Sequence, residues 1–201
     1  MDRAPRIILF GCGGHGRSVA DVLILNDPNV SLLFVDKNAA DNEKLYGFDV
    51  VRDMDPAGMP YIIALGDNRQ RMMKLQEIGE SGLISVVSVK AHVGHGSSVG
   101  KGCFLANYCH VGPEAKIGNN TIINTAAVVE HEVRIGNHCH VGPGAVISGR
   151  SAIGDLAFIG VGAVVKDNIS ICSDVIVGAG ATVIRNIDEP GTYVGTPVRK
   201  L

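Results

Sequence analysis

The sequence predicts two units, a small α/β unit followed by a β-solenoid, and three observations support this fold class. Aliphatic residues recur at every sixth position through the second half of the chain. The first half instead alternates aliphatic runs with a glycine-rich loop and segments of helical spacing. The 201-residue chain contains 26 glycines and no tryptophan, a composition typical of many tight turns around an aliphatic core.

The second half is an uninterrupted six-residue repeat. Valine, isoleucine or leucine occupies every sixth position from Val87 to Val183, and glycine often follows it. The residue four places later is usually small, as at Cys103, Cys109 and Cys139. This pattern predicts a left-handed parallel β-helix in which three hexapeptide repeats form one triangular coil and the aliphatic residues stack inside. We assign residues 85–201 to this β-helix domain with a short C-terminal extension.

The first half, residues 1–84, is interpreted as a Rossmann-like βαβ domain. A strand at 6–10 leads into the loop Gly11-Cys12-Gly13-Gly14-His15-Gly16, and a helix follows from residue 17. Glycines at such a strand-to-helix turn let a phosphate approach backbone N–H groups at the helix N-terminus. The other expected elements are a strand at 31–35 that ends at Asp36, a strand at 61–65 and a helix at 69–80.

The size of this domain bears on its ligand. About 84 residues are too few for both halves of a dinucleotide-binding fold, so the glycine-rich loop does not indicate NAD. A single half of that fold is the right size to bind one nucleotide diphosphate. Asp36, about 20 residues after the loop, would accept hydrogen bonds from the ribose or the base.

Composition limits the partners and the compartment. Eighteen Lys and Arg balance 20 Asp and Glu, which argues against nucleic acid as a partner. No apolar run approaches the ~18 residues of a membrane helix, and the first residues do not resemble a secretory signal. The five cysteines contain no C-x-x-C pair, so we expect reduced, mostly buried thiols and a cytoplasmic protein.

Two groups of histidines are candidates for chemistry. His92 and His110 are eighteen residues apart and should stack on successive coils, but a zinc site lacks a clear third ligand, so we expect no metal. His131 comes two residues after the inward Val129 and should project outward. The adjacent Glu132 would orient its imidazole and raise its basicity, which makes His131 a candidate general base.

Five segments of the sequence form a set: 11–16, Asp36-Lys37, 64–68, Asn124 through His131-Glu132 to His140, and Val194-Gly195-Thr196-Pro197. Together they closely resemble the bacterial PglD/NeuD-type sugar acyltransferases, over essentially the whole chain. The glycine-rich N-terminal half and the His-Glu pair narrow the resemblance from the broader group of hexapeptide acyltransferases. Cys12 is a departure, because relatives often have glycine there.

The resemblance implies a homotrimer with active sites between neighbouring β-helices. Acetyl-CoA would be the donor and co-substrate, and a nucleotide-linked amino sugar the acceptor. His131 would be the base and Glu132 its supporting carboxylate. His140 would contact acetyl-CoA near the thioester, and Val161 and Ala179 would line the pantetheine groove. The nucleotide would be held by Gly13, Gly14, His15, Asp36, Lys37 and the region of Gly66.

We therefore predict an acetyl-CoA-dependent N-acetyltransferase acting on a UDP- or GDP-linked 4-amino-deoxy sugar. The acetyl group would pass directly to the amine with no acyl-enzyme, since three of the cysteines occupy the small inward repeat positions. O-acetylation of a sialic-acid-type hydroxyl is the nearest alternative, and the sequence does not separate the two. A non-catalytic trimeric scaffold or sugar-nucleotide sensor has no need of the His131-Glu132 pair.

Overall fold

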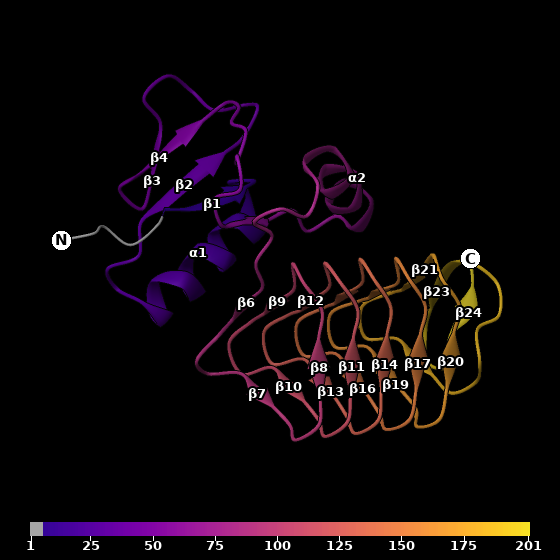
Figure 1. Ribbon diagram of the computed structural model, residues 1–201. Coiled ribbons are helices and arrows are strands. Elements are labelled where there is room, and N and C mark those ends of the chain that lie inside the picture. The colour runs from indigo at the N-terminus through magenta and orange to yellow at the C-terminus, as the bar shows by residue number, and fades with distance from the viewer. Residues whose placement is uncertain (1–5) are drawn as a thin grey trace.

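The computed structural model describes residues 6–201 and contains the two predicted units (Figure 1). Residues 1–5, on which the expectation of no secretory signal rests, lie outside the described residues. The strands of the first unit end at Ile63 and its last helix ends at Ile78, and the first strand of the β-helix begins at Val86. The fold class predicted from the sequence, an α/β unit followed by a parallel β-helix, is confirmed.

The first unit is built on a five-stranded sheet in the order β3-β4-β2-β1-β5. Strand β1 lies between β2 and β5 and is parallel to both, and the crossover through α1 connects it to β2. Helix α1 packs its buried face on one side of the sheet, and α2 covers the other through Leu75. The bounds are β1 (Ile7–Phe10), α1 (Gly14–Asn26), β2 (Leu32–Val35), β3 (Lys44–Leu45), β4 (Phe48–Val51), β5 (Tyr61–Ile63) and α2 (Asn68–Ile78).

The hairpin β3–β4 is the part of this sheet that sequence analysis did not specify. Its turn residues Tyr46 and Gly47 both have left-handed φ values, 54° and 84°. Such a turn usually shows itself as Asn-Gly or Asp-Gly, and Tyr-Gly does not carry that signal. Two-residue β3 is also too short to produce a visible alternation of polar and apolar residues.

The β-helix has three faces, each a parallel stack of short strands apart from the antiparallel β24. Partner residues on successive strands are eighteen apart, as with Val111, Val129 and Ile147. The six-stranded face contains β7 (His92–Val93), β10 (His110–Val111), β13 (Val128–Val129), β16 (Val146–Ile147), β19 (Val164–Val165) and β22 (Thr182–Val183). The five-stranded face contains β8 (Ser98–Val99), β11 (Lys116–Ile117), β14 (Arg134–Ile135), β17 (Ala152–Ile153) and β20 (Ser170–Ile171). The eight-stranded face contains β6 (Val86–Val87), β9 (Phe104–Leu105), β12 (Ile122–Ile123), β15 (His140–Val141), β18 (Phe158–Ile159), β21 (Val175–Val177), β23 (Gly191–Val194) and β24 (Arg199–Lys200).

The aliphatic column of the repeat forms the interior of the β-helix, as predicted, from Leu105 to Val183. The first coil differs. Val87 and Val93 are 37% and 41% exposed, because no earlier coil covers them. Cys103, Cys109 and Cys139 are buried at the small inward positions, and burial raises the pKa of the Cys109 and Cys139 thiols to about 12.

The N-terminal unit sits over the eight-stranded face. Phe104, Ala106 and Ile122 of that face belong to the same apolar cluster as Val19 and Leu23 of α1. The chain visits the faces in the order eight-, six- and five-stranded, so the corner between the last two lies across the triangular coil from this unit. That arrangement decides which candidate residues one chain can bring together.

Candidate active site

The glycine-rich loop contains glycines of two kinds. A Cβ at Gly16 would lie 2.2 Å from the carbonyl oxygen of Gly11, and one at Gly11 would lie 2.8 Å from that of Ala64. These two glycines are required by the packing of the loop. Gly13 and Gly14, in contrast, are exposed, and nothing lies within 4 Å of a Cβ at either position. Gly13 is also the N-cap residue of α1, so its open side faces the position where a helix N-terminus attracts an anion.

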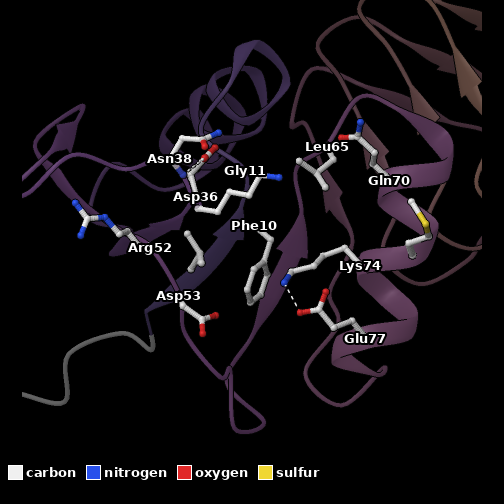
Figure 2. Close-up of a pocket in the computed structure, with 13 residues that line it drawn as sticks. Phe10, Gly11, Asp36, Asn38, Arg52, Asp53, Leu65, Gln70, Lys74 and Glu77 are labelled. Carbon is white, nitrogen blue, oxygen red and sulfur yellow. Dashed lines mark hydrogen bonds and ion pairs between the residues drawn. The ribbon is translucent and has the colours of Figure 1, made fainter.

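A cleft of about 740 Å³ opens beside this loop, at the carboxyl ends of the strands (Figure 2). Of the predicted residues it collects Asp36 and Lys37, together with Gly11 of the loop. Phe10, Val35 and Leu65 contribute apolar lining, and charged groups surround them (Figure 2). Sequence analysis missed the lining residues Arg52, Asp53, Lys74 and Glu77, which follow the short strand β4 or lie on α2. The volume and mixed lining suit a nucleotide.

Asp36 is held in the cleft by the unusual residue of the loop. The Cys12 backbone N–H and thiol both donate to Asp36 Oδ2, at 3.2 and 3.3 Å. The backbone N–H of Asn38 donates to Oδ1 at 3.0 Å, and this bond is the main reason why the pKa of Asp36 is lowered. Cys12 therefore orients the carboxylate that sequence analysis assigned to the ribose or base. The thiol itself is a poor nucleophile, because burial and Asp36 raise its pKa to about 11.

His140 lies in the joint between the two units, where both of its ring nitrogens are paired. Nδ1 is 3.1 Å from the Gly66 carbonyl oxygen, and Nε2 is 3.0 Å from the amide nitrogen of Asn124. A carbonyl oxygen only accepts and an amide NH₂ only donates, so Nδ1 carries the proton and the ring is neutral. The His15 ring is 6.2 Å away and packs edge-on against Phe104. The structure thus brings the predicted residues His15, Gly66 and His140 together.

Among residues 6–201, Arg71 is the largest fully buried side chain, and it stabilises this joint between the two units by hydrogen bonds to both. Its guanidinium donates to Oδ1 of Asn68 and to five backbone carbonyl oxygens. Burial lowers its pKa to about 10, so it keeps its charge at neutral pH. The carbonyl oxygens belong to Leu65 and Gly66 of the loop before α2, and to Asn120, His138 and Cys139 of two successive coils.

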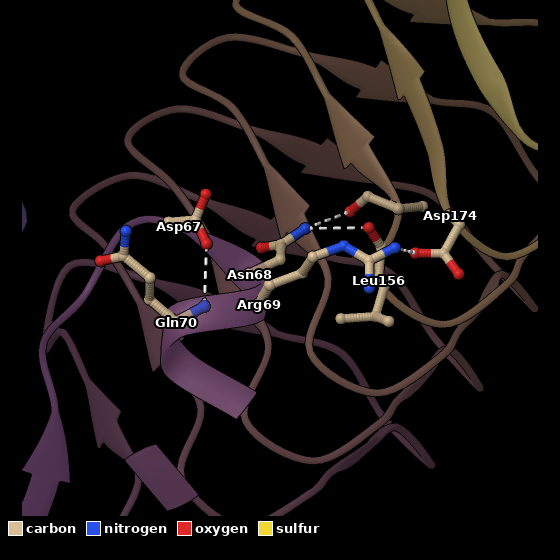
Figure 3. A network of polar contacts seen from close by, with 7 residues as sticks. Asp67, Asn68, Arg69, Gln70, Leu156 and Asp174 are labelled. Atoms are coloured by element: carbon tan, nitrogen blue, oxygen red, sulfur yellow. Dashed lines mark hydrogen bonds and ion pairs between the residues drawn. The ribbon is translucent and has the colours of Figure 1, made fainter. Parts of the chain in front are cut away.

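The N-terminus of α2 extends this joint along the β-helix (Figure 3). Asp67 caps the helix by accepting from the backbone N–H of Gln70. Asn68 then donates to the carbonyl oxygens of Leu156 and Ala157, at 3.1 and 3.0 Å. An exposed ion pair between Arg69 and Asp174 completes the contact (Figure 3). The position of the cleft relative to the coils is therefore set by many bonds from one helix.

The buried histidines predict a loss of stability in mild acid. Burial lowers the pKa of His15 to about 3 and that of His140 to about 4. As pH falls below about 6.5, the unfolded chain takes up protons that the folded chain does not, so the free energy of unfolding decreases. At pH 5 the loss amounts to about 2 kcal/mol for each histidine. Urea unfolding at pH 7.5 and pH 5 measures it. His15→Phe should reduce the pH dependence of the free energy of unfolding, whereas His95→Asn, at an exposed position, should not. An equal pH dependence in the wild-type protein and in both variants would contradict the assignment.

His131 and Glu132 form the predicted pair. His131 Nδ1 is 3.0 Å from Glu132 Oε2, and the two side chains are 43% and 48% exposed. The carboxylate only accepts, so Nδ1 holds the proton and the lone pair of Nε2 is free to take one. Glu132 stands at a left-handed turn position, with φ 60°, where its N–H donates to the Pro113 carbonyl oxygen. The pair projects outward at the corner between the six- and five-stranded faces.

The residues predicted to line the pantetheine groove lie at another corner. Val161 and Ala179 are both exposed, eighteen residues apart, between the eight- and six-stranded faces. Asn107 and Thr125 occupy the same corner in earlier coils and line a second pocket of about 240 Å³ with Arg17 of α1. This corner therefore presents a continuous surface from α1 toward the last coils. One chain does not bring it together with His131, which lies at a different corner of the coil.

No group of three or more His, Cys, Asp or Glu side chains within residues 6–201 is arranged to hold a metal ion. His92 and His110 stack as expected, with ring centroids 4.9 Å apart and an interplanar angle of 8°.

Within the described residues 6–201, neither helix is long and apolar enough to cross a membrane.

Two family models match parts of this chain. Residues 6–78 match the family model of the PglD N-terminal domain, and residues 114–149 match that of the bacterial transferase hexapeptide, six repeats. No curated protein sequence matches the chain.

Three solved structures are similar over nearly their whole length. The acetyltransferase domain of PglB from Neisseria gonorrhoeae FA1090, in complex with acetyl coenzyme A, has 27% identity and a TM-score of 0.90, and the match covers 98% of this chain and 99% of that one. A mutant of perosamine N-acetyltransferase from Caulobacter crescentus, in complex with CoA and GDP-perosamine, has 30% identity, a TM-score of 0.88 and coverages of 97% and 96%. WeeI from Acinetobacter baumannii AYE has 27% identity, a TM-score of 0.89 and coverages of 97% and 99%.

Proposed function

Because this chain belongs to the PglD-type family of acetyl-CoA-dependent sugar acetyltransferases, we propose that its acceptor is the amino group of a nucleotide-linked 4-amino-deoxy sugar. The observation that carries the proposal is the His131–Glu132 pair, which leaves Nε2 as a free base on an exposed coil corner. The similar Caulobacter enzyme holds GDP-perosamine, which supports a nucleotide-linked amino sugar here. Either UDP or GDP would suit the cleft beside Asp36 and Lys37.

The chemistry follows from the groups present. Nε2 of His131 takes the proton that the amine loses as its nitrogen attacks the thioester carbonyl carbon. Glu132 stabilises the imidazolium that forms, because it already accepts from Nδ1. Backbone N–H groups of the coil turns would stabilise the oxyanion of the tetrahedral intermediate. The C–S bond then breaks, and the thiolate leaves and is protonated. Acetyl passes directly to nitrogen.

Two separate surfaces would hold the substrates. The nucleotide would lie in the cleft, with its phosphates at Gly13, Gly14 and the N-terminus of α1. Acetyl-CoA, the co-substrate, would run along the corner of Val161 and Ala179, whose exposed apolar side chains would line the pantetheine arm. His140 would face the thioester end of this surface, beside Thr125 and Asn124. The free cysteines, three of them buried, support a cytoplasmic location.

We further propose a homotrimer with parallel β-helix axes. The cleft belongs to a unit on the eight-stranded face, and His131 lies at the corner opposite that face. A substrate held by one chain would therefore meet the His131 of a neighbouring chain. The six-stranded face offers an apolar strip for that contact, made of the half-buried Val128 and Val146 and the exposed Val164. Light scattering is expected to give the mass of a trimer; a stable monomer with full activity would overturn this arrangement.

The acceptor is tested by thiol release. The protein is incubated with acetyl-CoA and a panel of UDP- and GDP-linked amino sugars, the same sugars without nucleotide, and a sialic-acid-type acceptor. We expect release with a nucleotide-linked amino sugar and an acetamide in the product by mass spectrometry. Release only with the hydroxyl acceptor would assign O-acetylation instead. If no acceptor in the panel gives release above the hydrolysis of acetyl-CoA alone, the proposal is wrong.

A further inference from the structure

Gly149 lies directly beneath the imidazole of His131. It is buried, and it follows His131 by eighteen residues, which places it at the same point of the next coil. A Cβ at Gly149 would lie 2.5 Å from both Cε1 and Nε2 of His131 and 3.1 Å from Cδ2. All three nearest atoms belong to this one ring. The side of the ring that carries Nε2 therefore occupies the space where any other residue would place its side chain.

The β-helix itself does not require a glycine at this point. The φ of Gly149 is outside the left-handed region, so its backbone suits any residue. The equivalent positions of other coils are filled by Pro113, Asp167 and Arg185. At glycines that the coil packing does require, an added Cβ would instead meet backbone atoms. At Gly112, for example, it would lie 2.7 Å from the backbone nitrogen of His131.

We propose that Gly149 is a positioning residue that lets the imidazole of His131 lie close against the next coil. The proposal rests on the proposed function of His131 as general base. Three contacts then hold His131, two at its ring and one at its backbone. Glu132 accepts from Nδ1 at 3.0 Å, and the Arg150 N–H donates to the His131 carbonyl oxygen at 3.0 Å. Gly149 sets how closely the ring approaches the coil, and so where Nε2 stands.

A methyl group at position 149 would push the ring away from the coil. Contacts as short as 2.5 Å do not occur between a Cβ and ring atoms, so the imidazole must move. The movement turns Nε2 away from the amine or separates Nδ1 from Glu132. Displacements of about 1 Å at a reacting group cost up to 10²-fold in rate. We expect Gly149→Ala to lower kcat by at least tenfold, while the KM values for both substrates change little.

The experiment compares Gly149→Ala with a matched control, Asp167→Ala, which removes a side chain from the same point one coil further on. Both variants are made in the wild-type and in the His131→Ala background. If Gly149 acts through the ring, Gly149→Ala should have no further effect once His131 is absent, because the group that it displaces is gone. Asp167→Ala should leave kcat unchanged. An equal loss of activity from Gly149→Ala in both backgrounds would overturn the proposal.

A second measurement does not depend on activity. The ring protons of His131 are identified in NMR spectra as the signals that His131→Ala removes. Gly149→Ala should shift these signals and leave those of stacked His92 and His110 in place. Unshifted His131 signals with wild-type kcat would overturn the role of Gly149 and leave the base assignment intact. Full activity of His131→Ala would instead overturn the base assignment, and the NMR shift would still test whether Gly149 seats the ring.

Discussion

Replacing His131 with alanine is expected to lower kcat by about 10²–10⁴-fold, the effect of losing a general base. The amine can no longer give up its proton to a positioned group as it attacks the thioester. Both KM values should change little, because the cleft and the corner of Val161 and Ala179 lie away from this side chain. Steady-state kinetics with each substrate varied in turn measures the separation.

The fold should tolerate this change. The ring is 43% exposed and leaves the interior column at Val129 and Ile135 untouched, so the free energy of unfolding should shift by about 0.5 kcal/mol or less. Glu132→Ala should cost less activity, since it removes the support and keeps the base. A His131→Ala variant that retains more than about a tenth of wild-type kcat would move the base elsewhere.

Replacing Gly13 with valine is expected to raise the KM for the nucleotide sugar by about 10²-fold, as for the loss of one or two hydrogen bonds to a charged group. The branched side chain would stand where phosphate oxygens approach the N–H groups at the start of α1. The KM for acetyl-CoA should stay near its wild-type value, because the donor is assigned to the β-helix. Nothing lies within 4 Å of a Cβ at Gly13, and its φ of −69° suits any residue, so the loop keeps its structure.

Gly16→Val provides the contrast. Its Cβ would lie 2.2 Å from the Gly11 carbonyl oxygen, so this variant should lose stability rather than affinity alone. Thermal unfolding separates the two cases: Gly13→Val should unfold at the wild-type temperature and Gly16→Val well below it. Equal rises of both KM values in Gly13→Val would contradict the division of the substrates between the two units.

The β-helix could be predicted closely from the sequence because its core repeats with a fixed period. Once the six-residue period is recognised, the position of each inward aliphatic residue can be predicted from the one before it. The interior from Leu105 to Val183 follows directly. The exposure of Val93 shows the limit of the rule, because a period does not say where the stack of coils begins to be covered. The same arithmetic placed His110 on His92, and it also places Gly149 under His131. That second relation was missed because a glycine in this repeat is readily interpreted as a turn residue.

The joint between the units could not be predicted in this way. Arg71 stands in a helix rich in charged and polar residues, where an arginine normally faces solvent, and its acceptors are spread over residues 65–139. Arg52 and Asp53 of the cleft follow a strand that gave no clear pattern. The contacts of Cys12 with Asp36 likewise depend on how the loop closes. Each of these depends on distant segments meeting, which local periodicity does not record.

The bonds of Arg71 have a consequence for how freely this protein can change. Five of its six acceptors are backbone carbonyl oxygens, and Asn68 also binds two carbonyl oxygens of the coils. A carbonyl oxygen is the same whatever residue carries it. Mutations can therefore exchange the side chains at those coil positions and keep these backbone bonds, whereas the ion pair of Arg69 needs Asp174. The N-terminal unit is in this sense tolerant of sequence change in the coils beneath it, as long as the apolar contacts of Phe104, Ala106 and Ile122 with α1 are kept.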